Sequence, residues 1–236
     1  MIPSGVAAFR ETFQRERIPR NYSGMLHLAL TVGASAIVVL YCLFHLHEVR
    51  AWEWLTIPVT FLYANMTEYF THRVLMHYPV PGLKRVFVGH TLEHHHYFTD
   101  ESMELDGMRA LAVILFPPLM LALFVGIFAF PVAFLVGYLV SPNSGYLFLA
   151  VAMGYYANYE LFHLAYHMPE NSRVGRLPFM KRLRQFHTRH HDLRWMSRYC
   201  FNITYPIGDL IFGTMPLKPA AKAVPKPKDR TTFPAS

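Results

Sequence analysis

Charged residues are scarce in this chain. Asp, Glu, Lys and Arg make up 16% of its 236 residues, whereas hydrophobic residues make up 53%. A water-soluble domain of ordinary composition carries about 25% charged residues. This shortfall, together with a mean hydropathy of +0.21, argues against a soluble globule and indicates a protein embedded in lipid.

Cysteine is nearly absent as well. Cys42 lies within an apolar run and Cys200 lies near the C-terminal tail, so the two are far apart in the sequence. Neither has a neighbouring cysteine with which it could form a disulfide or a thiolate metal site. The sequence therefore argues against a disulfide framework and against a cysteine-rich zinc site.

Four long apolar runs divide the chain. A membrane-spanning helix needs about 20 predominantly apolar residues. Runs close to that length cover residues 25–46, 54–70, 111–140 and 146–164. The third run is too long for one straight span and contains Pro117, Pro118 and Pro131, so we expect a kink or a preceding interfacial piece. Residues 141–145 (SPNSG) are typical of a turn. The pattern predicts an all-α integral membrane protein built as a four-helix transmembrane bundle.

The segments outside these runs differ in character. Residues 1–24 contain four arginines, and the apolar run that follows them lacks a small-residue cleavage pattern, so we expect a cytosolic segment and no signal peptide. Residues 25–215 are predicted to form one membrane domain. Residues 216–236 are rich in Pro, Lys and Ala and are predicted to be a disordered tail.

Basic residues indicate the orientation in the membrane. Of the 22 Lys and Arg residues, only Arg50 lies in a loop that would face the outer side. Because cytoplasmic loops carry the excess of Lys and Arg, we expect four spans with both termini in the cytoplasm, in a bacterial inner membrane or the endoplasmic reticulum. The net charge of +7 then reflects a basic face against anionic headgroups, and we expect no nucleic-acid partner.

Histidine is concentrated at the cytoplasmic ends of the predicted spans. Eleven of the 14 histidines fall in two windows, which contain the strings HRVLMH, HTLEHH, HLAYH and HTRHH. The candidate metal ligands in these four boxes are His72, His77, His90, His94, His95, His163, His167, His187, His190 and His191. His96, which follows the second box, could be a ligand or a spare residue on the substrate side. We interpret the remaining histidines as interfacial anchors.

Helical spacing predicts how the rings group. Residues three or four apart share one helix face. We therefore expect His90 to converge with His94, His163 with His167, and His187 with His190 and His191. His72 and His77 are five residues apart, about 140° round an ideal helix, so they need a local distortion to reach one site.

Ten imidazoles are too many for one ion, which takes about four to six ligands. Two ions that share them are the simplest solution. Imidazole suits Fe, Zn, Cu and Ni, so the ligands alone do not identify the metal. Glu68 and Glu160 stand about one helical turn before a box, and Asp192 directly follows the last one. We expect these three carboxylates to hold the ligating rings in place.

The boxes, introduced by the glutamate of EYFTHRVLMH and followed by NITYPIGDLIFGT, resemble the signature of the fatty acid hydroxylase/sterol desaturase superfamily. The resemblance implies a four-helix transmembrane base with a cytosolic helical cap that holds two iron ions. It also implies an oxidoreductase that uses O2 and external electrons to hydroxylate, or less favourably desaturate, a fatty acyl chain or sterol. We expect the electrons to come from a separate protein of the cytochrome b5 or ferredoxin type with its reductase.

Rival interpretations remain open at this point. The string LPFMKRLRQFHTRHH looks like the last box of carotenoid ring hydroxylases, which makes such an enzyme the alternative within the same class. A membrane metal transporter is the alternative of another class, but it would place ligands at mid-bilayer depth. A zinc membrane hydrolase usually needs only three protein ligands, far fewer than the boxes supply.

The predicted topology can be tested with reporter fusions. A reporter active only in the cytoplasm should be active at the C-terminus and inactive when inserted within residues 141–145, because the basic residues sort to one side of the membrane. An external C-terminus would contradict the four-span topology and place the histidine boxes on the wrong side for a cytosolic electron donor.

Overall fold

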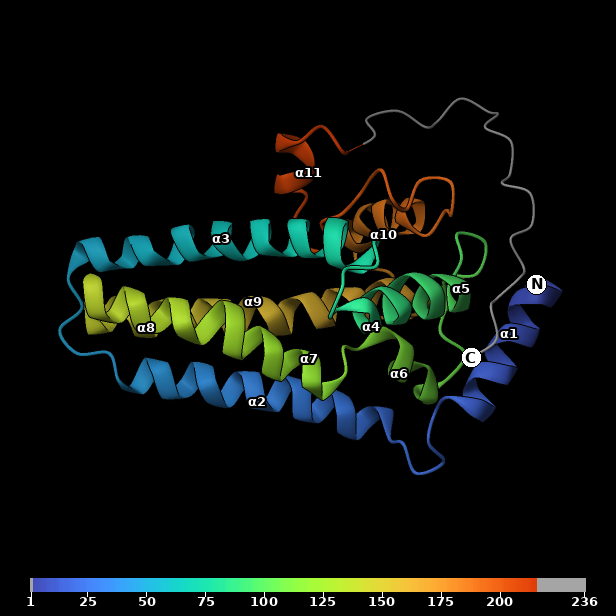
Figure 1. The fold of residues 1–236 in the computed structure, drawn as a ribbon, viewed down its shortest axis with the longest axis horizontal. Coiled ribbons are helices and arrows are strands. Elements are labelled where there is room, and N and C mark those ends of the chain that lie inside the picture. The colour runs from blue at the N-terminus through green and yellow to red at the C-terminus, as the bar shows by residue number, and fades with distance from the viewer. Residues whose placement is uncertain (1, 216–236) are drawn as a thin grey trace.

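The computed structural model describes residues 2–215 (Figure 1), so the tail predicted at residues 216–236 lies outside the described residues. Across this range the chain is helical, and the one β-type pairing is an isolated bridge between Thr99 and Ser102. The α-helices are α1 (Ser4–Glu16), α2 (Gly24–Phe44), α3 (Thr56–Phe70), α4 (Lys84–Phe87), α5 (His95–Tyr97), α6 (Leu111–Ile114), α7 (Pro118–Leu123), α8 (Phe130–Leu139), α9 (Pro142–His167), α10 (Pro178–His190) and α11 (Ile207–Ile211). Short 3-10 helices are η1 (Ala51–Leu55) and η4 (Met108–Ala110), and π-helical segments are η2 (Thr71–Met76), η3 (Val88–His94) and η5 (Phe124–Ala129).

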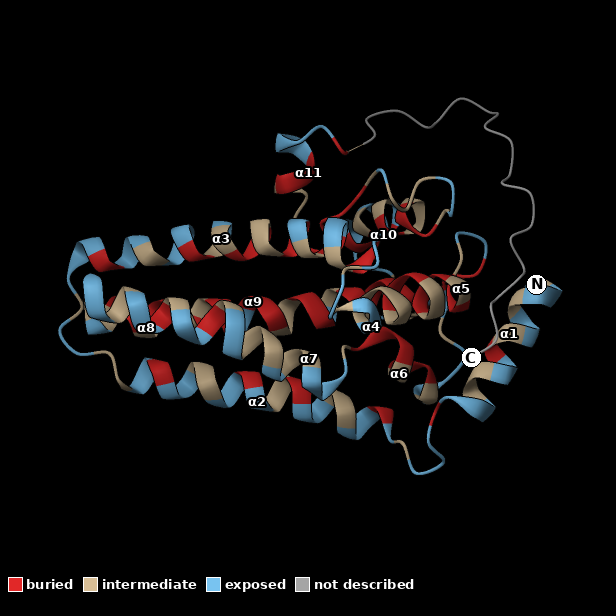
Figure 2. Cartoon of the chain, in the orientation of Figure 1, coloured by how far each residue is buried: buried red, intermediate tan, exposed pale blue. Residues whose placement is uncertain are grey.

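Helices α2, α3, α8 and α9 run side by side, and helices α4, α5, α6 and α10 gather at one end of them (Figure 1). Helix α9 is central, because it packs against α2, α3 and α8. It is buried along much of its length, whereas the outward faces of its neighbours are exposed (Figure 2). The fold is therefore a bundle in which α2, α3 and α8 pack against α9, with further helices gathered at one end.

The exposed faces of the long helices are apolar. Ile37 and Phe44 of α2 are 69% and 79% exposed, and Phe134 and Leu139 of α8 are 67% and 66% exposed. Large apolar patches of this kind mark surfaces that another molecule or a membrane covers. Two segments, Gly24–Phe44 and Met108–Leu139, are long and apolar enough to cross a membrane by length and composition.

The segment Met108–Leu139 is interrupted where its prolines lie. Helix α6 ends at Ile114, and Leu115 and Pro117 are extended before α7 begins at Pro118. A second irregularity, the π-helical η5, precedes Pro131 in the first turn of α8. Proline lacks an N–H and its ring clashes with the preceding turn, so each proline fits the start of a helical piece.

The expected turn does not extend over residues 141–145, because residues 142–145 belong to α9 and Ser141 is its N-cap. Pro142 is the first helical residue, and the Ser141 hydroxyl accepts a hydrogen bond from the Ser144 N–H at 3.1 Å. A serine cap followed by proline favours a helix start, since proline has its φ preset and no N–H to satisfy there. Helix α9 extends beyond the apolar run 146–164 at both ends, and His163 and His167 lie near its C-terminal end.

The contact between α8 and α9 requires Gly145. A Cβ atom at this position would lie 2.7 Å from the Gly137 Cα and 2.8 Å from the Ala133 carbonyl oxygen. Gly145→Ala should push the helices apart and lower the free energy of unfolding by about 1–3 kcal/mol, measured by denaturant unfolding in detergent. Gly154→Ala is the matched control in the same helix, because its Cβ would meet nothing within 4 Å. Equal stability of the two variants would contradict the close contact.

Candidate metal centre

The ten box histidines form two buried clusters at the end of the bundle where the short helices gather. Each ring is at most 6% exposed. Within each cluster the potential ligand atoms lie within 4.8 Å of one another. The first cluster consists of His72, His77, His90, His95 and His190, and the second of His94, His163, His167, His187 and His191.

Two π-helical segments bring the first cluster together. In a π-helix the hydrogen bonds run from residue i to i+5, so residues five apart come onto one face. Segment η2 places the rings of His72 and His77 with their centroids 5.1 Å apart. This is the local distortion that their spacing demanded. π-helical turns of this kind occur mostly at functional sites.

The prediction that His90 and His94 converge on one site is wrong. Because η3 is π-helical, His90 groups with His95, five residues later, at an Nε2–Nε2 distance of 3.1 Å. His94 turns to the second cluster. The last box is divided too, because His187 and His191 enter the second cluster and His190 enters the first. Helical spacing identified the rings but not their partition.

Backbone carbonyl groups set the ring tautomers. Their oxygens can only accept, so each facing Nδ1 carries the hydrogen. The Nδ1 atoms donate as follows: His72 to Phe201 at 2.5 Å, His94 to Val113 at 2.9 Å, His167 to Met103 at 2.8 Å, His190 to Tyr199 at 3.2 Å and His191 to Phe98 at 2.7 Å. A neutral ring with Nδ1–H leaves its Nε2 lone pair free for a metal ion.

The Nε2 atoms approach one another without a hydrogen to share. His94 and His191 both donate through Nδ1, yet their Nε2 atoms are 3.1 Å apart. Two nitrogens bound to one ion at about 2.0–2.1 Å, at a right angle, would stand about 2.9 Å apart. The donor set and its spacing therefore fit a transition-metal ion better than a hydrogen bond.

Protonation is the other way to relieve facing lone pairs, and the surroundings oppose it. Burial lowers the pKa of His72 to about 4 and that of His94 to about 3. For His90, His95 and His190, burial and then the neighbouring imidazoles lower the pKa well below the ordinary value. At neutral pH these rings are uncharged and available as ligands.

The carboxylates expected to support the rings bind elsewhere among the described residues. Glu68 accepts hydrogen bonds from the backbone N–H groups of Ile203 and Thr204 and from the Tyr155 hydroxyl. Glu160 accepts from the Phe116 N–H at 3.1 Å. Buried N–H groups outside regular helices need acceptors, and these two acids supply them, so they tie loops to α3 and α9.

Asp192 and His96 belong to neither cluster. The carboxylate of Asp192 accepts from the backbone N–H and the guanidinium of Arg194. The Nδ1 atom of His96 is 3.3 Å from the Thr91 carbonyl oxygen, and His96 belongs to neither cluster. For five of the ten rings, a backbone carbonyl thus takes the place that the sequence assigned to a carboxylate.

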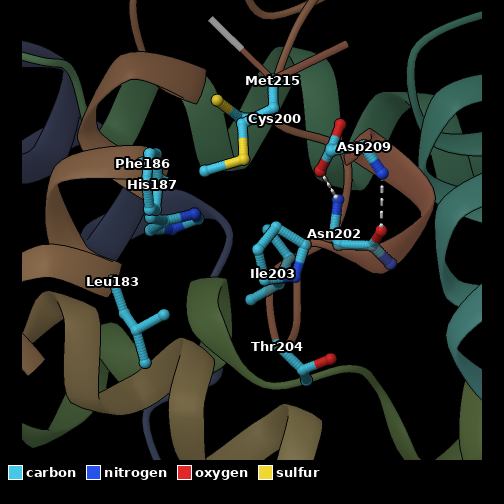
Figure 3. Close-up of a pocket in the computed structure, with 10 residues that line it drawn as sticks. Leu183, Phe186, His187, Cys200, Asn202, Ile203, Thr204, Asp209 and Met215 are labelled. Carbon is cyan, nitrogen blue, oxygen red and sulfur yellow. Dashed lines mark hydrogen bonds between the residues drawn. The ribbon is translucent and has the colours of Figure 1, made fainter. Parts of the chain in front are cut away.

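The C-terminal loop shows how such a carbonyl is held. Asp209 is 1% exposed and accepts from the N–H groups of Phe201 at 2.9 Å and Asn202 at 2.7 Å. The Asn202 side chain accepts in return from the Asp209 N–H at 3.2 Å (Figure 3). This reciprocal pair fixes the Phe201 carbonyl that faces His72. A carbonyl has no sequence signal, so residue patterns could not find it.

Two clefts share lining residues, and one of them is lined by box histidines. One, of about 280 Å³, is lined by His90, His94 and His163. The other, of about 260 Å³, is almost entirely apolar and lies between α3, α7, η5 and α9. Phe116 lines both clefts. Its ring stacks on that of Tyr159 with centroids 5.3 Å apart. An apolar site therefore leads toward the histidines.

Comparisons with known proteins agree with this arrangement. The family model described as "Fatty acid hydroxylase" matches residues 57–214. The chain resembles a solved structure titled "Full length scs7p (only hydroxylase domain visible)" at a TM-score of 0.61 and 23% identity, which covers 84% of this chain and 69% of that one. A comparison with curated proteins finds no match.

The buried imidazoles predict a pH dependence for the metal-free protein. In the unfolded chain a histidine titrates near pH 6.5, whereas in the folded protein the pKa of His72 is about 4 and that of His94 about 3. Between these values the unfolded state binds more protons, so stability is full above about pH 6.5 and declines as the pH falls toward 4. Denaturant unfolding of chelator-treated protein across this range measures the effect. Stability that rises on acidification would contradict the neutral clusters.

Proposed function

Because the chain belongs to the fatty acid hydroxylase family, we propose that it is a membrane di-iron oxygenase that hydroxylates a C–H bond of a lipid. O2 is the co-substrate, and the electrons come from a separate donor protein. The observation that carries this proposal is the pair of five-imidazole clusters beside a cleft lined by His90, His94 and His163, which shares Phe116 with an apolar cleft. The first and second clusters would each hold one ion.

Bound iron would activate O2, the oxidant that an unactivated C–H bond demands, because iron changes its oxidation state and zinc does not. The protein itself orients the imidazole rings and excludes water. Carbonyl groups keep Nδ1 protonated and aim Nε2 at the ion. The buried, aromatic surroundings keep water away from the reacting atoms.

The apolar cleft suits a hydrocarbon substrate. Leu123, Phe124, Ile127 and Phe128 line it from α7 and η5. The nearby helix faces are exposed and apolar, so an acyl chain or sterol can reach the cleft from the bilayer without crossing water. Phe116 lines both this cleft and the cleft that contains the histidines. A lipid chain that passes from one cleft to the other would contact its ring.

The four-span topology belongs to the same proposal. Helix α2 and the segment formed by α7, η5 and α8 are apolar enough to span, and α3 and α9 lie beside them. The cluster residues come from η2, η3, α5, α10 and the C-terminal end of α9, and α5, α10 and that end of α9 lie at one end of this bundle (Figure 1). A metal transporter would place its ligands at mid-bilayer depth, so the position of the clusters favours an enzyme with a cytoplasmic cap.

Lipid analysis of a host with and without the gene tests the activity. A lipid that gains one oxygen atom supports hydroxylation, loss of two hydrogens indicates desaturation, and an oxygenated carotenoid indicates the ring-hydroxylase alternative.

His163→Ala and His190→Ala, one from each cluster, should reduce the product to background because each removes a ligand. His45→Ala should retain near-normal product, because His45 stacks on Tyr41 away from both clusters. Equal loss in all three variants would contradict the assignment.

A further inference from the structure

The loop that follows α5 orients two rings of the second cluster. The Phe98 carbonyl accepts from His191 Nδ1 at 2.7 Å, and the Met103 carbonyl accepts from His167 Nδ1 at 2.8 Å. Both carbonyls lie outside regular helices. Their directions therefore depend on whatever holds this loop in place.

Arg10 of α1 holds the loop at three points. Its Nε donates to the Tyr97 carbonyl at 2.8 Å, its Nη2 to the Ser102 carbonyl at 2.7 Å and its Nη1 to the Glu104 carbonyl at 3.1 Å. Tyr97 directly precedes Phe98, and Ser102 and Glu104 flank Met103. The three bonds thus bracket both carbonyls that face the second cluster.

The guanidinium is buried for this purpose. Arg10 is 3% exposed and lies 5.0 Å from the ring centroid of Tyr97 and 5.2 Å from that of Phe98. Asp106 is its carboxylate partner, at 4.0 Å. A buried charge is tolerated only when it is paired and hydrogen-bonded, and the planar fork of arginine can reach three carbonyls at fixed angles.

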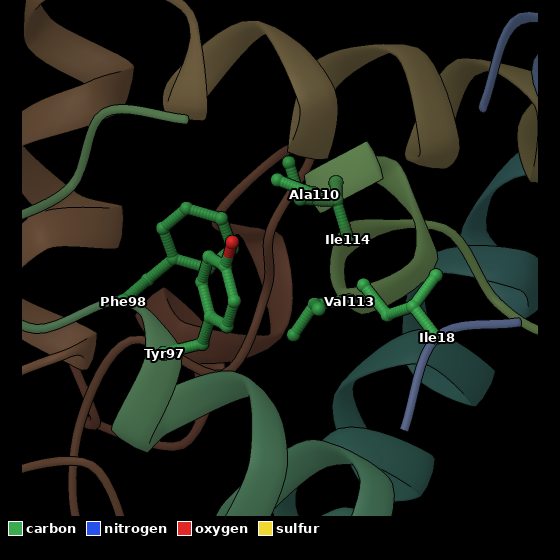
Figure 4. Packing of buried hydrophobic residues seen from close by; sticks show 6 residues of the cluster. All are labelled: Ile18, Tyr97, Phe98, Ala110, Val113 and Ile114. Atoms are coloured by element: carbon green, nitrogen blue, oxygen red, sulfur yellow. The ribbon is translucent and has the colours of Figure 1, made fainter. Parts of the chain in front are cut away.

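The surrounding packing makes this contact rigid. Tyr97 and Phe98 belong to a buried cluster with Ile18, Ala110 and Ile114 (Figure 4). The Tyr97 hydroxyl donates to Asp106 at 2.7 Å. Helix α1 lies outside residues 57–214, which the family model covers, so this support comes from a segment that the family signature does not include.

We propose that Arg10 is a positioning residue for the second cluster. By fixing the backbone of residues 97–104, it sets the Phe98 and Met103 carbonyls and, through them, the orientation of His191 and His167. The inference rests on the proposed metal centre. The side chain binds the loop and not the ion, so its loss should affect the second cluster and spare the first.

Titration of the purified, chelator-treated full chain with Co²⁺, followed by visible absorption, tests this. In a His190→Ala background the intact cluster is the second one, and there Arg10→Gln should weaken binding about 10–100-fold, the usual cost of losing an outer support. In a His187→Ala background the intact cluster is the first one, and there the same change should leave affinity unchanged. Arg10→Lys, which keeps the charge without the fork, should show a smaller loss with the same selectivity.

Arg15→Gln is the matched control on α1, because Arg15 is 66% exposed and pairs with Glu16; it should bind Co²⁺ like the parent in both backgrounds. Equal weakening by Arg10→Gln in the two backgrounds would show general destabilisation and overturn the proposal, as would no weakening in either. A parent chain that takes up no Co²⁺ would overturn the metal centre itself. The two failures are therefore distinguishable.

Discussion

Ten uncharged imidazoles packed with their Nε2 atoms facing one another are the constraint on which the rest of the structure depends. His94 and His191 approach to 3.1 Å through nitrogens that carry no hydrogen. Burial and mutual repulsion oppose the protonation that would otherwise relieve this contact. Cations placed between these nitrogens would relieve the contact, so the donor set of each cluster fits a metal ion.

The surrounding structure is organised to hold these rings. The π-helical segments η2 and η3 contain His72, His90 and His94, and His77 and His95 directly follow them. These two segments therefore orient five of the ten imidazoles. Loops at residues 97–104 and 199–202 present carbonyl oxygens to Nδ1 atoms, and each loop is tied by one buried charged residue, Arg10 or Asp209. Glu68 and Glu160 also act on loops, which explains why acids so near the boxes do not contact imidazole.

The bundle contributes position more than chemistry. Helix α9 lies at its centre and carries His163 and His167 near its C-terminal end, so packing along the whole helix determines where two imidazoles of the second cluster lie. The outward faces of α2 and α8 are apolar, and an apolar cleft lies beside α3 and α7. The histidine clusters and these apolar surfaces thus belong to one helical framework.

The sequence by itself determined the class of the protein. Scarce charge and long apolar runs indicate a protein embedded in lipid, because hydrophobicity is a property of each residue and can be read without the fold. The four boxes identified a family that the match over residues 57–214 confirms. The all-helical character was also predictable. Only the tertiary structure decided which histidines share a cluster, since a switch from α to π geometry moves His94 away from His90 and no residue type signals that switch. It also decided the partners of Nδ1: every residue has a carbonyl, so the choice of Phe98, Met103 and Phe201 depends on how distant segments pack.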